Sequence, residues 1–198
     1  MTSRRRRKAV AHARGGRTRS AAAGAVAAAV WALQEPLDQR LFKGDYSDVA
    51  VLGKGLTGGR AWWPAGFALH LANGALFGVA YHEARRRWPV RPRTLAVGMA
   101  LAEHAALYPL SYFVDRYHPR RGAPGVPPLL GNRKAFGQAT WRHAVFGLVL
   151  GLAAQEHSGS RGLGGRVPPS RRHTPTLEVR RVPGRSPCSP AWRSSRPA

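Results

Sequence analysis

Four long apolar runs, separated by shorter polar segments, organise the chain. They cover residues 21–38, 61–81, 95–114 and 137–156. A helix needs about 20 residues to cross the hydrocarbon layer of a membrane, and the second and third runs have this length. These two runs also lack the wide charged face of a helix on the surface of a soluble bundle. The pattern therefore predicts four transmembrane helices.

Aromatic residues gather near the ends of several runs, as they do at membrane interfaces. They are Trp62, Trp63 and Tyr81 around the second run, Tyr108, Tyr112 and Phe113 late in the third, and Trp141 early in the fourth. A soluble bundle whose buried helices are apolar on all sides is the alternative, because polar residues interrupt the runs and the mean hydropathy of the chain is negative.

An internal repeat indicates how the runs pair. His70-x3-Gly74-x3-Gly78 matches His143-x3-Gly147-x3-Gly151, and Ala32–Glu35 matches Ala100–Glu103 less securely. The predicted fold class is therefore all-α, a polytopic membrane bundle of four helices arranged as two tandem hairpins. Glycines four residues apart let a neighbouring backbone approach closely. The expected packing positions are Gly74, Gly78, Gly147 and Gly151, assisted by Gly24, Ala28, Gly98 and Ala102.

The positive charge of the chain is concentrated at its two ends. The 198 residues include 32 Lys and Arg against 9 Asp and Glu, a formal charge of +23. Residues 1–20 hold eight basic residues and residues 157–198 hold nine. The C-terminal segment, rich in Arg, Pro, Ser and Gly, lacks a sustained apolar period, and both ends are predicted to be disordered.

The distribution of basic residues also predicts an orientation. With the N terminus in the cytoplasm, the two tails and the five arginines of residues 82–94 lie inside, against nine basic residues in the two outer loops. This positive-inside pattern predicts a multi-pass protein of the cell membrane with both termini cytoplasmic. A cleaved signal peptide within residues 1–33 is a competing interpretation of the first run, because it also combines an Arg-rich segment with an apolar one.

The same charge suggests partners. The basic cytoplasmic side is expected to contact the anionic headgroups of membrane lipids. A second copy of the chain, or another membrane protein, is open as a further partner. Nucleic-acid binding through the Arg-rich tails is the alternative from a different class, and it is less favoured because most of the charge lies on one predicted side of the bilayer.

Several polar residues fall within or close to the apolar runs. They are Glu35, His70, Asn73, Glu103, His104, Arg142 and His143. A charged side chain at the centre of a bilayer costs about 2.5–3.5 kcal/mol on insertion scales, so these groups are expected to pair with one another. Three interpretations compete: an interhelical clamp, a proton or cation path, and ligation of a metal or haem by His70 and His143. The spacing of the histidines does not support ligation, so no metal and no cofactor is expected.

The segment between the first two runs carries weaker signals. Asp38, Asp45 and Asp48 are expected to pair with the basic residues Arg40, Lys43 and Arg60. The formal Gly-x-Gly-x-x-Gly of residues 53–58 lacks the strand, the helix and the later acid of a dinucleotide site, so a flexible loop is expected. No nucleophile elbow or phosphate-binding loop is present, and a single cysteine, Cys188, excludes a disulfide within the chain. We therefore expect no enzyme.

Three stretches carry a resemblance to known proteins. Residues 31–52 (WALQEPLDQRLF, then DYSDVAVL), Val114-Asp-Arg-Tyr-His-Pro119 and Ala139-Thr-Trp-Arg-His143 resemble a group of uncharacterised small bacterial integral membrane proteins with four spans. The resemblance covers about residues 30–155 and omits both tails. It implies a membrane location and a four-helix fold, and it brings no activity, cofactor or site residue.

Overall fold

The part of the chain that the structure describes is entirely α-helical. The computed structural model describes the backbone of residues 3–159 and the side chains of residues 14–154, and it has no strand in that part. The predicted all-α class is confirmed. The helices are α1 (Ser3–Phe42), α2 (Asp48–Leu56), α3 (Trp62–Arg87), α4 (Pro92–Leu107), the 3-10 turn η1 (Tyr108–Leu110), α5 (Ser111–Tyr117) and α6 (Arg133–Gly159). None of these helices combines the length and the apolar character of a transmembrane segment.

The first helix is much longer than the first apolar run. α1 begins at Ser3, so the backbone of the basic segment 3–20 is helical and not the disordered tail that we predicted. Arg, Lys and Ala are strong helix formers, and no proline occurs before Pro36, so the Ala-rich helix extends into this segment. The predicted C-terminal tail lies, from residue 160 onward, outside the described residues.

Two further corrections concern the predicted boundaries. The third run is not one continuous helix, because Pro109 lacks a backbone N–H and the chain passes through η1 between α4 and α5. The Gly-rich segment is not a flexible loop, because residues 48–56 form α2, which Ser47 caps by accepting a hydrogen bond from the Ala50 N–H. Gly53 of α2 faces the backbone of α3 so closely that a Cβ atom there would overlap the carbonyl of Trp62.

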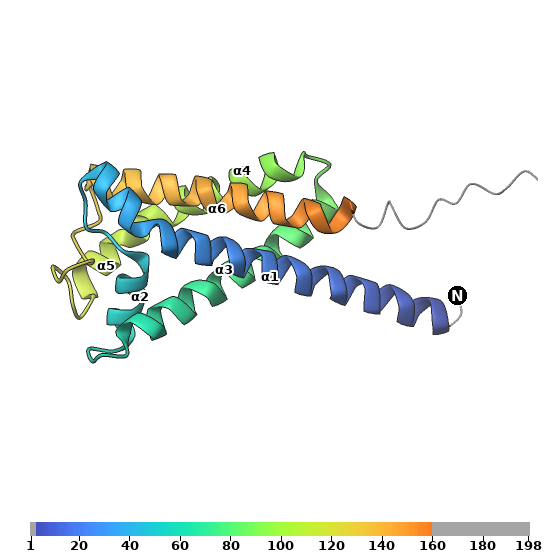
Figure 1. Cartoon of the computed structure of the whole chain (residues 1–198), viewed down its shortest axis with the longest axis horizontal. Coiled ribbons are helices and arrows are strands. Elements are labelled where there is room, and N and C mark those ends of the chain that lie inside the picture. The colour runs from blue at the N-terminus through green and yellow to red at the C-terminus, as the bar shows by residue number, and fades with distance from the viewer. Residues whose placement is uncertain (1–2, 160–198) are drawn as a thin grey trace, which may run out of the picture. The chain divides into compact units, whose positions relative to one another are not determined.

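The long helices pack as two pairs, α1 with α3 and α4 with α6 (Figure 1). α1 also packs along α6 and thereby joins the two pairs, whereas the consecutive helices α3 and α4 make few contacts. A core of small and aromatic residues, including Ala27, Trp31, Tyr81 and Phe146, lies between them. The two helices within each hairpin are thus in close contact. Of the two interfaces between the hairpins, the one of α1 with α6 is closed and the one of α3 with α4 is open.

Both hairpins are joined at glycines. A Cβ atom at Gly74 would lie 2.6 Å from the carbonyl oxygen of Gly24, and one at Gly147 would lie 2.6 Å from the Cα atom of Val97. Gly78 and Gly151 make the equivalent contacts one turn later, and Ala28 contacts Gly74. Gly98 and Ala102, which we expected to assist, are exposed and lie outside these contacts.

The contacts fix the register of the repeat. Gly24 and Gly74 in the first hairpin become Val97 and Gly147 in the second when both numbers are raised by 73. The same shift relates the ring pair Trp31 and His70, with centroids 5.1 Å apart, to the ring pair His104 and His143, with centroids 4.8 Å apart.

This register differs from the weaker match made from sequence. It aligns Pro36 with Pro109 and Glu35 with Tyr108, so Glu35 and Glu103 are not equivalent. The contacts between helices therefore support the histidine and glycine part of the repeat and reject the glutamate part.

Candidate functional site

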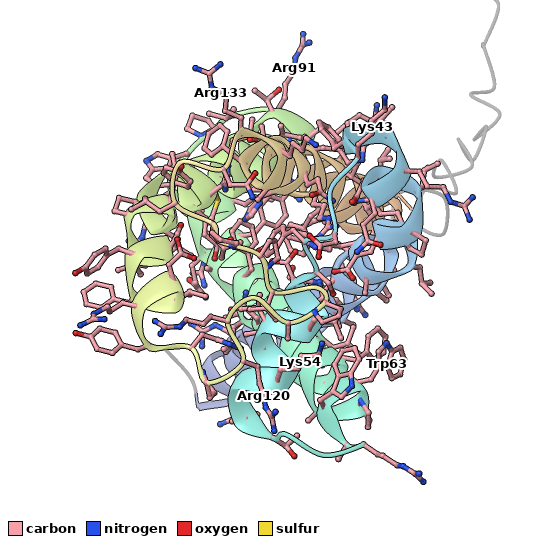
Figure 2. All side chains as sticks on the ribbon, turned by 90° about the vertical axis from the view of Figure 1, so that its left-hand side faces the viewer. Lys43, Lys54, Trp63, Arg91, Arg120 and Arg133 are labelled. Carbon is pink, nitrogen blue, oxygen red and sulfur yellow. The ribbon has the colours of Figure 1, made fainter. Side chains whose placement is uncertain are left out.

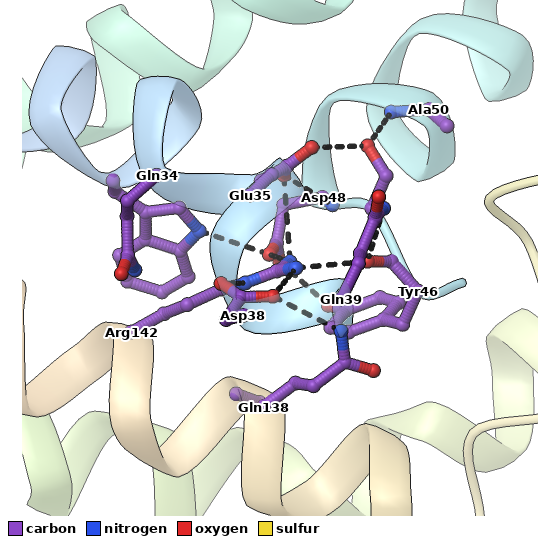
Figure 3. Close-up of polar contacts among 12 residues, drawn as sticks. Gln34, Glu35, Asp38, Gln39, Tyr46, Asp48, Ala50, Gln138 and Arg142 are labelled. Carbon is purple, nitrogen blue, oxygen red and sulfur yellow. Dashed lines mark hydrogen bonds and ion pairs between the residues drawn. The ribbon is translucent and has the colours of Figure 1, made fainter. Parts of the chain in front are cut away.

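Arg142 of α6 lies at the centre of a buried polar cluster (Figure 3). Its side chain is fully buried. Asp38 and Glu35 approach it from α1, and Asp48 approaches it from the first turn of α2. We call these four residues the arginine cluster.

The arginine cluster uses every donor of the guanidinium. Arg142 Nε and Nη2 each donate to one oxygen of Asp38 at 2.6 Å, which is the bidentate geometry favoured by arginine and a carboxylate. Nη1 donates to Asp48 Oδ2 at 2.8 Å and to Glu35 Oε1 at 3.4 Å, and Nη2 also donates to the carbonyl of Tyr46 at 2.9 Å. A guanidinium has five N–H groups, so none is left for a substrate or a mobile ion.

Neighbouring groups hold the three carboxylates in place. Asp48 accepts hydrogen bonds from Trp31 Nε1 at 3.0 Å and from the Tyr46 hydroxyl at 2.5 Å. Ser47 Oγ and the Asp48 backbone N–H donate to Glu35, at 2.7 and 3.1 Å. Burial has the largest single effect and disfavours the charged form of Asp48, but the Arg142 guanidinium, His70 and the hydrogen bonds from Tyr46 and Arg142 together outweigh it, so the pKa of Asp48 lies below its usual value.

The cluster corrects our assignment of acid partners. We expected Asp38 and Asp48 to pair with surface bases such as Arg40, whereas both bind Arg142. Asp45, the third acid of that segment, is exposed. Two signals in the sequence point to the cluster: Arg142 is the one Lys or Arg within the four apolar runs, and Asp38 lies three residues after Glu35, on the same face of a helix.

The three histidines of the predicted network lie close to Trp31 and to one another. The Trp31 ring contacts His70 and His143 edge to face, with centroids 5.1 and 4.5 Å apart. His143 Nδ1 lies 2.7 Å from the carbonyl oxygen of Ala139. His104 Nε2 lies 3.0 Å from Thr140 Oγ1, whereas His70 Nε2 is buried and has no hydrogen-bond partner.

Glu103 and Asn73, the remaining residues of the predicted network, lie apart from the arginine cluster. Glu103 is half-buried on α4, and Asn73 is exposed on α3. No hydrogen bond or ion pair among the described residues joins either of them to Arg142. The structure thus divides the predicted network into a closed ionic cluster and a separate group of histidines.

The histidines and Glu103 line a cavity of about 340 Å³. Asn73 and Phe77 of α3 form one side of the cavity, and Glu103 and Leu107 of α4 form another, where these two helices make few contacts. Within the described residues, no group of three or more His, Cys, Asp or Glu side chains could hold a metal ion. The arrangement can therefore bind a molecule through one carboxylate, imidazole nitrogens and apolar walls.

Comparisons with known proteins add no further evidence on the site. The chain matches no family model, no curated protein and no solved structure.

Proposed function

We propose that the chain is an integral membrane protein, and the observation that carries this proposal is an inverted polarity of its helices. Within residues 21–38, 61–81, 95–114 and 137–154, no exposed side chain carries a charge, and the charged groups present are buried or half-buried. The outward faces carry leucines instead. Leu33 is 77% exposed, Leu37 is 64% exposed and Leu76 is 69% exposed.

An aqueous surface does not favour this distribution. Burying apolar area contributes about 25 cal/mol per Å², so these exposed leucines on α1 and α3 forgo stabilisation in water that a lipid environment would supply. At the same time the protein holds three carboxylates and an arginine inside. A bilayer accounts for both features, because it requires apolar outer faces and confines ionised groups to a paired interior.

Outside those four ranges, exposed charges gather toward the two ends of the bundle. Lys43, Lys54 and Arg120 project from the end of the bundle where α1 ends and α3 begins (Figure 2). Residues 85–93, with their five arginines, connect α3 to α4 at the opposite end, where α1 begins and α6 ends (Figure 1). This second end is the more basic one, and we place it and both termini at the cytoplasmic face, against anionic lipid headgroups.

Within this proposal the arginine cluster is a structural clamp that ties α6 to α1 and α2. Its saturated donors favour a clamp over a proton or cation path, because an ion moving through the cluster would have to break the bidentate pair of Arg142 and Asp38. The resemblance to small bacterial four-span membrane proteins implies the same location and fold.

Fractionation of cells that express the full chain tests the location. We expect the protein to stay with the membranes through high-salt and alkaline carbonate washes and to be released by detergent. Release by either wash without detergent would contradict the membrane proposal. Release by nuclease would favour the alternative of nucleic-acid binding through the Arg-rich ends.

Cysteine labelling tests the orientation separately. In a Cys188→Ser background, single cysteines replace Gly58, between α2 and α3, and Val90, between α3 and α4. A membrane-impermeant maleimide added outside intact cells should label the cysteine at position 58 and not the one at position 90. The reverse pattern would invert the topology without affecting the location.

A further inference from the structure

The cavity is acidic although the chain is strongly basic. Two carboxylates, Asp48 and Glu103, lie among the described residues that line it, and no lysine or arginine does. The chain has 32 basic residues and 9 acidic ones, yet the charged side chains that line the cavity are both acidic. A cationic guest would therefore meet no repulsion from its walls.

One of the two carboxylates lacks a counter-charge. Asp48 is neutralised by Arg142 and also accepts hydrogen bonds from Trp31 and Tyr46. Glu103 has no ion pair with a described residue. Partial burial without a partner disfavours the charged form of a carboxylate, and a bound cation would offset this cost at Glu103.

The remaining walls suit an organic cation better than a metal ion. Aromatic rings surround the space, and they belong to Trp31, Tyr46, Phe77, Tyr108, Phe136 and Phe146. Aromatic faces attract ammonium groups and also bind the apolar part of such a ligand. A volume of about 340 Å³ accommodates a molecule of moderate size, and ligand pockets of this size are generally apolar with few polar groups.

A second and independent feature points to a ligand with a donor group. His70 lines the cavity, is 6% exposed, and leaves its Nε2 atom without a hydrogen-bond partner. A neutral imidazole with its proton on Nδ1 offers a lone pair at Nε2. An unmade hydrogen bond of a buried group is costly, and an N–H donor of a bound molecule would supply it.

We infer that this cavity binds a small hydrophobic ammonium ion, with Glu103 as its counter-charge, His70 as an acceptor and the aromatic rings around its apolar part. This inference goes beyond the proposed membrane location and does not depend on it. The cavity exists in the folded chain, whether detergent or buffer keeps that chain in solution.

Three probes of equal length but different charge test the inference: 4-phenylbutylammonium, 4-phenylbutanol and 4-phenylbutyrate. Each is titrated calorimetrically into the purified full chain at neutral pH, with the heats for empty micelles subtracted where detergent is present. We expect the ammonium to bind about tenfold more tightly than the alcohol, as a charge-assisted hydrogen bond allows. The carboxylate should not bind.

Two variants assign the effect to the cavity. Glu103→Gln keeps the shape of the side chain and should lower the affinity for the ammonium about tenfold without changing that for the alcohol. Glu83→Gln is the matched control, because Glu83 pairs with Arg17 and does not line the cavity. His70→Phe should weaken the ammonium more than its trimethylammonium analogue, which has no N–H group to donate.

Equal binding of the ammonium, the alcohol and the carboxylate to the original chain would overturn the inference, as would no binding of any probe. An unchanged affinity for the ammonium in a folded Glu103→Gln variant would also overturn it. If that variant does not fold, the relative affinities of the original chain for the ammonium, the alcohol and the carboxylate decide whether the inference holds. The fractionation result is independent of these titrations, so failure of the membrane proposal and failure of this inference remain distinguishable.

Discussion

Replacing Arg142 by methionine removes the cation from the arginine cluster and leaves its three carboxylates without an ion-pair partner. Glu35 keeps the donors of Ser47 and the Asp48 backbone, and Asp48 keeps those of Trp31 and Tyr46. Asp38 is fully buried and keeps only the amide of Gln138, at 3.0 Å. Removing one partner of a buried ion pair costs about 3–5 kcal/mol, and we expect a loss of this size in the free energy of unfolding.

The loss is measured by titrating the protein with sodium dodecyl sulfate in mixed micelles and following helicity. Arg133→Met is the matched control, because Arg133 is exposed in the first turn of the same helix and its replacement should change the free energy by at most about 0.5 kcal/mol.

A second substitution separates charge from packing. Combining Asp38→Asn with Arg142→Met removes the charge that the single variant leaves unpaired, while the side chain keeps its size. We expect this double variant to recover about 2 kcal/mol of the loss. A loss below about 1 kcal/mol in the single variant would refute the assignment of the cluster as a clamp. No recovery in the double variant would mean that lost packing, and not an unpaired charge, causes the instability.

The other predictions concern the helix contacts and the acids. Gly74→Ala should destabilise by about 1–3 kcal/mol in the same unfolding assay, because the new Cβ would lie 2.5 Å from that of Ala28. Gly98→Ala should instead stabilise by up to about 1 kcal/mol, since no atom of another helix lies within 4 Å of its Cβ position and alanine favours the helix; a loss there would contradict the packing. Ser47→Ala should cost about 1–2 kcal/mol, because it removes the cap of α2 and a donor to Glu35. The pKa of Asp48 is lower in the folded chain than in the unfolded chain. The stabilisation of the fold by ionised Asp48 is therefore complete above the ordinary aspartate pKa of 3.8 and is lost as the pH falls through the lower pKa of the folded chain. The destabilisation caused by Asp48→Asn, measured against the original chain, should therefore shrink below about pH 4, and an unchanged difference would be evidence against the pairing with Arg142.

The sequence was sufficient to locate the four long helices, because each apolar run is long and has few interruptions, but it did not predict α2 or the first part of α1. It predicted less well where a helix ends inside a run. Pro109 marks the end of α4 and the start of a new helix, but Pro36 lies within α1 without ending it. Local propensity is the same at both prolines, so contacts with other helices must decide between them.

The candidate site was predictable only in part. Arg142 and Glu35 were expected to meet because a charge inside an apolar run needs a partner. The main partner, Asp38, and the second acid, Asp48, were assigned to surface bases nearby in sequence. Their actual partner lies about 100 residues away, and the path of the chain between the helices determines that contact. The isolation of Glu103 likewise follows from the open interface between α3 and α4, which no local pattern reveals.

The repeat explains why a clamp and a cavity occur in one molecule. The shift of 73 residues places α1 on α4 and α3 on α6, so the interface of α1 with α6 corresponds to the interface of α4 with α3. Asp38 then corresponds to Ser111, and Arg142 corresponds to Leu69. The first interface is closed by the bidentate pair of Asp38 and Arg142. The second has neither charge, and Ser111 there lines the cavity.

Glu103 is likewise confined to the second half of the repeat, since the same shift matches it with the apolar Val30. The acids of the first hairpin therefore bind a cation that belongs to the chain, whereas the acid of the second faces a space without one. Two hairpins with the same glycine contacts have in this way acquired different interfaces. One holds the bundle together, and the other leaves room for a guest.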